Sequence, residues 1–261
     1  MSVRAEVAAV LAGTATARLL RLLGCSRGHA RRPSSGPGPL LPGLTEYTRP
    51  VSGTYRARTW IPPLAVRAAA LAEALEFGAS SRPEVGRLLH TLTSSVRDGC
   101  IGEIGTGCGY GSAWIASALS QSGRLVTVER DTERADAARR LFADLPQVHV
   151  LHGEWTALLQ HGPFDLLFVD GAGSDLKRPV EGVGPDQEPD VLAPLLAAVR
   201  LGGLIVLDDL TPETAWPPEW RGRPDPTRSL WLNNPRLAAT ELIVDPAAGP
   251  HSVVIVASRI A

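Results

Sequence analysis

The sequence predicts an α/β fold in which a mostly parallel sheet carries helices on both faces. Three observations support this fold class. Short apolar runs alternate with Ala- and Leu-rich segments from residue 56 to residue 261. A glycine-rich stretch separates one apolar run from the next predicted helix, and several apolar runs end in an acidic residue. The 261-residue length suits one large domain with appendages.

The glycine-rich stretch gives the clearest signal. Ile101–Ile104 reads as a short buried strand, Ser112–Ser120 as a helix and Gly123–Glu129 as a second strand. Glycines allow positive φ and close approach of a ligand to the backbone, and the start of a helix offers N–H groups. An acid at the end of the second strand can bind the two hydroxyls of a ribose, and Glu129 comes 24 residues after Gly105. This order of elements predicts a nucleoside-binding unit.

The same stretch resembles the first motif of the class I S-adenosylmethionine-dependent methyltransferases, which reads apolar-apolar-acid-apolar-Gly-x-Gly-x-Gly. Glu103, Gly105, Gly107 and Gly109 stand at the motif positions, and Gly102 replaces the apolar residue before the acid. The resemblance implies a Rossmann-like, seven-stranded methyltransferase sheet whose final strand is antiparallel. It also implies S-adenosyl-L-methionine as the cofactor.

The resemblance assigns parts of the cofactor to parts of the chain. Glu129 would bind the ribose, the glycine loop would receive the methionine portion, and Glu154 or Trp155 would meet the adenine. The candidate cofactor residues are Glu103, Gly105, Thr106, Gly107, Gly109, Tyr110, Glu129, Arg130, Gly153, Glu154, Trp155 and Asp170.

Two helices are predicted before the first strand. The first spans Leu64–Phe77, and the second begins within Ser80–Glu84, with a serine hydroxyl as cap and proline in the first turn. Small-molecule O-methyltransferases of the catechol and caffeoyl-coenzyme-A type have similar leading helices with a Pro-Glu-x-Gly-x-Leu-Leu stretch. The matching residues here are Pro83, Glu84, Gly86, Leu88 and Leu89.

The elements after Glu129 continue the alternation. Asp131 is predicted to cap the next helix, and the segment from Thr211 to Arg228 is predicted to be irregular because it holds five prolines. The long loop Gly171–Pro189 is predicted to be a lid or an acceptor-contacting segment. The predicted helices are Thr132–Phe142 and Val191–Val199, and the predicted strands are Val148–His152, Phe164–Asp170, Leu204–Asp209, Leu237–Val244 and Ser252–Ser258.

Acidic residues at the strand ends point to the acceptor side of the site. Parallel strands bring their carboxyl ends to one edge, so Glu129, Asp170, Asp208 and Asp209 are expected along one rim. Clustered carboxylates suit a hard divalent ion such as Mg²⁺, which could lower the pKa of an acceptor hydroxyl. We expect Asp170 and Asp208 to be catalytic and take Asp170, Asp208 and Asp209 as candidate metal ligands.

The metal-dependent O-methyltransferases resemble this chain at the strand ends but differ in two residues. They have Asp after the fourth strand and Asp-Asn after the fifth, and Asp209 replaces that Asn. They also carry a lysine base three residues after the first Asp, where this chain has Gly173. Lys177 is nearby but out of register, so the base for the acceptor proton is not identified.

Four other functions were compared with the sequence, and two of them lack their motifs. The Gly-Thr-Gly-x-Gly-Tyr run also resembles protein-isoaspartate (protein-carboxylate) methyltransferases, but Val169-Asp170-Gly171 favours O-methylation of a small-molecule hydroxyl, such as a catechol or a secondary metabolite. The Asn/Asp-Pro-Pro-aromatic motif of base methylation and the Tyr-x-x-x-Lys pair of nicotinamide oxidoreductases are not evident. The replacement of lysine by Gly173 leaves a non-catalytic cofactor-binding protein as an alternative.

The composition narrows the choice of partners. The net charge of −1 and the lack of a basic stripe argue against a nucleic-acid partner. The apolar run in residues 2–24 is too interrupted to span a bilayer or to be a signal peptide. We expect residues 1–55 to be a flexible, dispensable extension and linker, and residues 56–261 to be the catalytic domain.

Cysteine usage and residue bias add the remaining expectations. The three cysteines show no metal or disulfide spacing, which favours the reducing cytoplasm. The abundance of Ala, Arg and Pro is typical of a high-GC bacterial genome. The predicted protein is thus cytoplasmic and bacterial, with a small-molecule acceptor, no nucleic-acid or membrane partner, and a homodimer as a candidate assembly.

Overall fold

A computed structural model describes residues 60–96, 98–171, 192–244 and 253–261 of the chain. The predicted extension 1–55 lies outside the described residues. So do residues 172–191, which hold nearly all of the predicted lid with Gly173 and Lys177.

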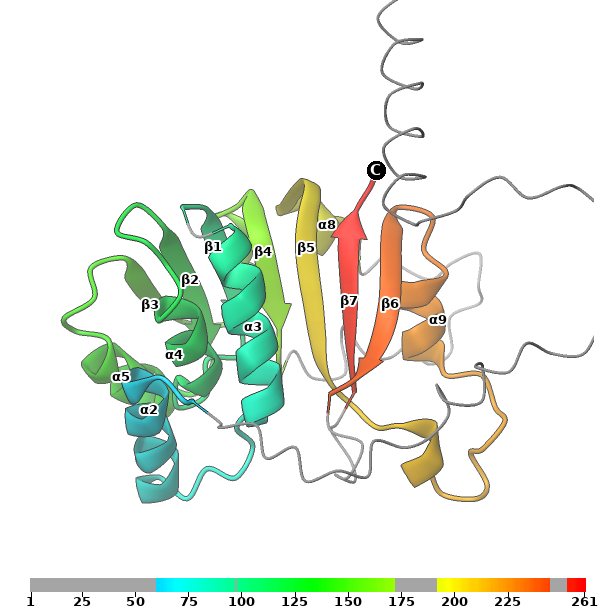
Figure 1. Ribbon diagram of the computed structural model, residues 1–261, viewed down its shortest axis with the longest axis horizontal. Coiled ribbons are helices and arrows are strands. Elements are labelled where there is room, and N and C mark those ends of the chain that lie inside the picture. The colour runs from blue at the N-terminus through cyan, green and yellow to red at the C-terminus, as the bar shows by residue number, and fades with distance from the viewer. Residues whose placement is uncertain (1–59, 97, 172–191, 245–252) are drawn as a thin grey trace, which may run out of the picture. The chain divides into compact units, whose positions relative to one another are not determined.

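One seven-stranded sheet forms the centre of the fold, in the order β3-β2-β1-β4-β5-β7-β6 (Figure 1). Strand β7 is antiparallel to both of its neighbours, whereas the pairs among β1 to β5 are all parallel. The strands are β1 (Cys100–Ile104), β2 (Arg124–Glu129), β3 (Val148–His152), β4 (Phe164–Val169), β5 (Val199–Leu210), β6 (Leu237–Ile243) and β7 (Val253–Arg259). The predicted Rossmann-like methyltransferase sheet with an antiparallel final strand is confirmed.

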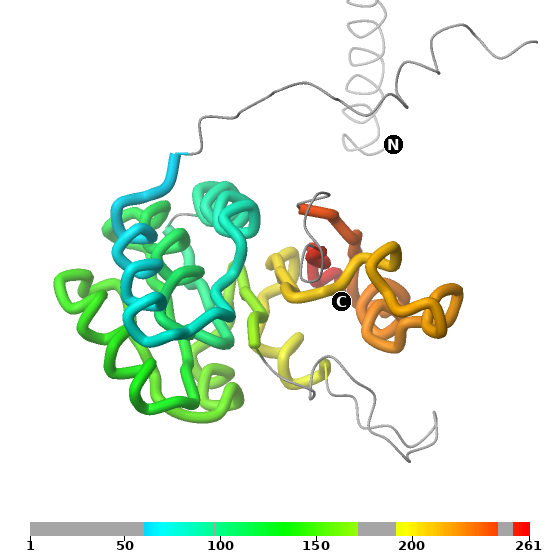
Figure 2. Tube along the Cα trace, turned by 90° about the horizontal axis from the view of Figure 1, so that it is seen from below, coloured from blue at the N-terminus to red at the C-terminus, as the bar shows by residue number. Residues whose placement is uncertain are grey.

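Helices cover both faces of this sheet (Figures 1 and 2). One apolar cluster gathers side chains from α2, α3, α4 and α5, and the other gathers side chains from α6, α8 and α9. The helices are α2 (Pro63–Ala74), α3 (Pro83–Ser95), α4 (Tyr110–Ala116), α5 (Thr132–Leu141), α6 (Thr156–Leu159), α8 (Ala193–Ala197) and α9 (Pro226–Leu232), with a 3₁₀ turn, η1 (Glu213–Ala215).

The central strand β4 shows why the sequence forms this three-layer arrangement. Leu166 and Phe168 pack in the cluster on one face, and Leu167 and Val169 pack in the cluster on the other face. All four side chains are completely buried, because both faces of a parallel sheet are covered. Burying each of these side chains stabilises the fold by about 1.5–3 kcal/mol. The strand is therefore a continuous apolar run and does not alternate between apolar and polar residues.

Strand β5 begins earlier than its sequence predicts. The predicted strand begins at Leu204, but Val199 already pairs with Phe164 of β4, and the register shifts before Leu204 pairs with Leu166. Gly202 has φ of +75°, which permits this irregular entry into the strand. The preceding helix α8 is correspondingly shorter than the predicted Val191–Val199.

The start of α3 also differs from its prediction. Arg82 occupies the N-cap position without a side-chain hydrogen bond, so neither serine before it caps the helix. The Ser81 hydroxyl instead donates to Asp170 Oδ2 at 2.9 Å. The predicted cap of α5 is confirmed, because Asp131 accepts a hydrogen bond from the Arg134 backbone N–H. The segment after β5 is less irregular than predicted, since it contains η1 and the first turn of α9.

The described helices include none with the length and apolar character needed to cross a membrane. The cytoplasmic location and the homodimer stay predictions.

The packing of α3 on α4 depends on a missing side chain at Gly86. A Cβ there would lie 2.3 Å from Trp114 Nε1, and Trp114 is completely buried. We expect Gly86→Ala to lower the free energy of unfolding by about 1–3 kcal/mol, because overpacking outweighs the better helix propensity of alanine. Urea denaturation measures this difference.

Gly78→Ala is the matched control, because a Cβ at Gly78 would meet nothing within 4 Å. It should leave the unfolding free energy nearly unchanged. Equal effects of the two substitutions would contradict the packing explanation.

Candidate active site

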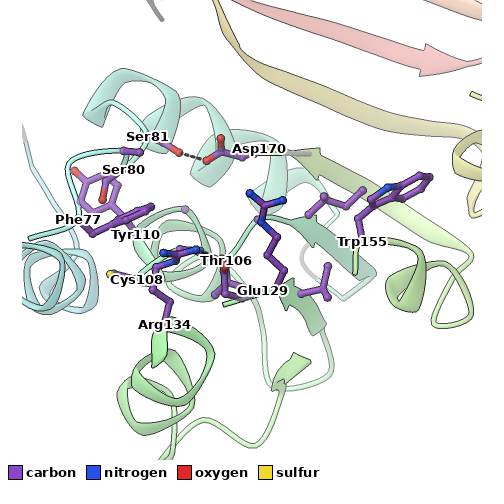
Figure 3. A pocket seen from close by; sticks show the side chains of 18 of the residues that line it. Phe77, Ser80, Ser81, Thr106, Cys108, Tyr110, Glu129, Arg134, Trp155 and Asp170 are labelled. Carbon is purple, nitrogen blue, oxygen red and sulfur yellow. Dashed lines mark hydrogen bonds and ion pairs between the residues drawn. The ribbon is translucent and has the colours of Figure 1, made fainter. Parts of the chain in front are cut away.

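A cavity of about 290 Å³ opens at the edge where the parallel strands end. Figure 3 shows Phe77 and Ser81 on one side of it, Trp155 on the other and Glu129 between them. The lining residues are Phe77, Ala79, Ser80, Ser81, Ile104, Gly105, Thr106, Gly107, Cys108, Tyr110, Gly111, Val128, Glu129, Arg130, Arg134, Gly153, Glu154, Trp155, Asp170, Gly171 and Asp209. Ten of the twelve predicted cofactor residues are among them, and the exceptions are Glu103 and Gly109.

The glycine loop turns tightly beneath this cavity. Gly105, Gly107 and Gly109 have φ values of +93°, +53° and +85°, which favour glycine. A Cβ on Gly105 would lie 1.9 Å from the carbonyl oxygen of Asp170. The loop therefore needs glycine at this position both for its conformation and for its contact with the end of β4.

Glu129 lies at the end of β2 with only 6% of its surface exposed. Its Oε2 accepts a hydrogen bond from the Gly107 N–H at 2.8 Å. Its Oε1 accepts from the Asp131 N–H and from Arg134 Nη2, each at 2.9 Å. The carboxylate thus joins the glycine loop to the start of α5 and faces the cavity.

Glu103 lies inside the protein, completely buried beneath the loop. Its Oε2 accepts hydrogen bonds from Ser112 and Thr127, and the Thr127 hydroxyl also lies 2.6 Å from that of Thr106. Burial raises the pKa of Glu103 to about 7, and the hydrogen bonds only partly offset this. Glu103 does not line the cavity. It is linked through Thr127 to Thr106, which does line the cavity.

The predicted adenine side is formed by the turn after β3. The Gly153 N–H donates to the Glu129 carbonyl at 2.9 Å, so this turn is tied to β2. Glu154 is exposed, and Trp155 is partly buried against the apolar core. His152 lies within hydrogen-bond distance of Thr132 and of the Arg130 carbonyl, which agrees with its interpretation as a strand-end residue.

The three aspartates predicted at the acceptor side come together. One carboxylate oxygen from each of Asp170, Asp208 and Asp209 lies within 4.8 Å of the others. Asp208 is buried and accepts a hydrogen bond from the Asp209 N–H at 2.8 Å. Asp209 has φ of +66°, an unusual conformation for a residue other than glycine, and it lines the cavity together with Asp170.

Comparisons with known proteins identify the family of this chain. Residues 103–210 match a protein-family model described as "Methyltransferase domain". A Mycobacterium avium protein named "Putative O-methyltransferase" is 30% identical over 174 residues, which cover 64% of this chain and 73% of the relative. This chain belongs to the O-methyltransferase family. A catechol O-methyltransferase of Niastella koreensis is 36% identical over 109 residues, covering 38% of this methyltransferase and 49% of the relative.

Solved structures support the fold of this methyltransferase. An O-methyltransferase from Bacillus cereus, solved in complex with SAH, has a TM-score of 0.59 at 24% identity, over 75% of this chain and 90% of that one. The O-methyltransferase TomG from Streptomyces achromogenes, solved with SAM, has a TM-score of 0.59 at 23% identity, over 77% and 92%.

Sequence reasoning missed several residues that line the cavity of this methyltransferase. Those with an aromatic, hydroxyl, thiol or charged side chain are Phe77, Ser80, Ser81, Cys108 and Arg134. Arg134 lies two residues inside the predicted helix Thr132–Phe142, and a serine before α3 was interpreted as its cap. No pattern in the sequence marks either residue, because both act through tertiary contacts. Arg134 binds Glu129 on a neighbouring element, and Ser81 binds Asp170, which lies far away along the chain.

The buried carboxyl of Glu103 makes stability depend on pH. Between about pH 4.5 and 7 the folded protein keeps a proton on Glu103 that the unfolded chain has lost, so raising the pH favours unfolding. We expect the stability of the wild type relative to Glu103→Gln to fall by about 2–3 kcal/mol from pH 5 to pH 8. Urea denaturation of both proteins at the two pH values measures this change. A difference that stays constant with pH would show that Glu103 does not titrate in this range.

Proposed function

We propose that this protein transfers the methyl group of S-adenosylmethionine to a hydroxyl oxygen of a small molecule. The observation that supports this most is a single cavity lined both by the glycine loop with Glu129 and by Asp170 with Asp209. The first set suits a nucleoside cofactor, and the second suits an acceptor hydroxyl.

The cofactor is proposed to lie along the edge of the sheet from β3 to β4. Glu129 would accept hydrogen bonds from the ribose hydroxyls, and Trp155 would cover the adenine ring. The methionine portion would lie over Gly105 and Gly107, where the absence of side chains lets it approach the backbone. The sulfonium would then face Asp170.

The acceptor side is suited to a divalent metal ion by its ligand chemistry. Three carboxylates at this separation repel one another in the ionised form, and hard cations such as Mg²⁺ favour oxygen ligands. Asp170, Asp208 and Asp209 would hold the ion, and replacing the family's Asn by Asp209 keeps an oxygen at that position. A bound ion would lower the pKa of an acceptor hydroxyl.

The chain's own residues would then orient the reacting groups. The acceptor oxygen forms a bond to the methyl carbon as the bond from carbon to sulfur breaks, which leaves a neutral thioether and releases the hydroxyl proton. Asp170 and Asp209 line the cavity and would hold the acceptor hydroxyl in line with the sulfonium. Ser81 fixes the Asp170 carboxylate by a hydrogen bond of 2.9 Å.

Glu129→Ala tests the cofactor half. Removing the carboxylate should weaken binding of S-adenosylhomocysteine by at least about tenfold, because hydrogen bonds to a charged acceptor are lost. Isothermal titration calorimetry measures the dissociation constant. Glu133→Ala is the control, because Glu133 is exposed in the first turn of α5 and does not line the cavity. Unchanged affinity in Glu129→Ala would rule out the ribose assignment.

Removal of divalent metal tests the acceptor half. With labelled S-adenosylmethionine and a panel of catechols, EDTA should abolish methyl transfer and excess Mg²⁺ should restore it. Asp209→Ala should lower the affinity for Mg²⁺ in calorimetry, whereas Asp144→Ala, which changes an exposed acid outside this cavity, should not. Full activity in EDTA together with no measurable Mg²⁺ binding would exclude the metal.

A further inference from the structure

Arg134 lies in the proposed cofactor cavity and is bound to the proposed ribose acceptor. Its Nη2 donates to Glu129 Oε1 at 2.9 Å, and its guanidinium carbon lies 5.1 Å from the centre of the Phe77 ring. The Nε atom is buried without a hydrogen-bond partner among the described residues. Arg134 lines the cavity, and Figure 3 shows its side chain among the others that line it.

The hydrogen bonds of Glu129 leave little room for a further ligand. A carboxylate offers about four acceptor positions, two on each oxygen. On Oε1 both positions are taken, one by the Asp131 N–H and one by Arg134. On Oε2 the Gly107 N–H takes one position and leaves one.

A ribose that uses both of its hydroxyls needs two of these positions. The position left on Oε2 serves one hydroxyl, and the second hydroxyl needs a position on Oε1. The Asp131 N–H belongs to the backbone at the start of α5 and is fixed there, whereas the Arg134 side chain is 28% exposed and can change rotamer. Binding of both hydroxyls therefore requires Arg134 to leave Glu129.

We propose that Arg134 is an internal competitor of the cofactor ribose for Glu129, and that it lowers the affinity of this enzyme for its cofactor. This inference rests on the proposed function, because it takes the ribose to bind at Glu129. The contact with Phe77 does not involve Glu129, so it can retain the guanidinium at the cavity after the ion pair opens. The ion pair thus keeps the buried carboxylate compensated when the site is empty and is given up when the site fills.

Arg134→Gln tests the competition directly. Removing the cation should make S-adenosylhomocysteine bind about two- to fivefold more tightly, which is the range expected for a partly exposed ion pair. Isothermal titration calorimetry with the full-length protein measures the dissociation constants. Arg140→Gln is the matched control, because Arg140 is exposed on the same helix and outside the cavity, and it should bind as the wild type does. Unchanged or weaker binding by Arg134→Gln would overturn the proposal.

Analogues of S-adenosylhomocysteine that lack the 2′- or the 3′-hydroxyl give a second measurement. In the wild type, one of the two analogues should bind within about threefold of S-adenosylhomocysteine. The hydroxyl that this analogue lacks gains a hydrogen bond to Glu129 only by displacing the hydrogen bond from Arg134. In Arg134→Gln the same analogue should lose about tenfold or more, since that hydroxyl now gains a hydrogen bond without displacing one. Equal losses in both proteins would overturn the proposal. The wild-type comparison also stands alone if Arg134→Gln does not fold, because a loss of tenfold or more for both analogues contradicts competition.

The outcomes separate this inference from the proposed function. If the wild type does not bind S-adenosylhomocysteine, the cofactor assignment itself fails. If the wild type binds and Glu129→Ala does not, but Arg134→Gln gains nothing, only the competition fails. Arg134→Lys keeps the positive charge and a hydrogen-bond donor and should bind S-adenosylhomocysteine as the wild type does. A merely structural role for Arg134 would not make the effect of removing one ribose hydroxyl depend on Arg134.

Discussion

The close approach of Gly105 to Asp170 joins the two halves of the site. The Asp170 N–H donates to the Ile104 carbonyl at 2.8 Å, and the Gly105 N–H donates to the Val128 carbonyl at 3.0 Å. These bonds hold the end of β1 between the ends of β2 and β4. Only glycine fits there, since a Cβ would lie 1.9 Å from the Asp170 carbonyl oxygen. The glycine loop and the end of β4 that carries Asp170 therefore meet without an intervening side chain, as the proposed methyl transfer requires.

Much of the fold could be predicted because strands that are buried on both faces of a sheet have continuous apolar sequences. The apolar runs of β1 to β4 and the glycine spacing, together with the resemblance, predicted a mostly parallel seven-stranded sheet with an antiparallel final strand, and the structure confirms it. The start of β5 could not be predicted, because Arg200–Gly202 are exposed and form no buried apolar run, yet they enter the strand through an irregular pairing. The prediction of a serine cap for α3 was wrong because the Ser81 hydroxyl donates to a tertiary partner, Asp170, and not to the helix.

The site was predictable where each residue belongs to a strand end. Glu129, Asp170 and Asp209 line the cavity because the carboxyl ends of parallel strands share one edge. Glu103 differs because it belongs to the interior of β1, where its side chain can only point into the core. Arg134 and Phe77 were missed because their roles depend on where α5 and the chain after α2 pack, which local pattern does not specify.

Two carboxylates near the loop thus have different surroundings and different tasks. Glu103 is enclosed by hydroxyl groups and keeps its proton to about pH 7, so it acts as a structural support. Glu129 is held at the edge of the cavity by backbone N–H groups and by Arg134, and the proposed competition makes it fully available to the ribose only when Arg134 leaves. We propose that this second carboxylate binds the ribose of the cofactor.

A crystal structure with bound S-adenosylhomocysteine tests that claim most directly. We expect the ribose hydroxyls within hydrogen-bond distance of Glu129, the adenine against Trp155, the thioether facing Asp170, and Arg134 turned away from Glu129. A ribose bound elsewhere in the cavity, with the ion pair between Glu129 and Arg134 intact, would contradict the account.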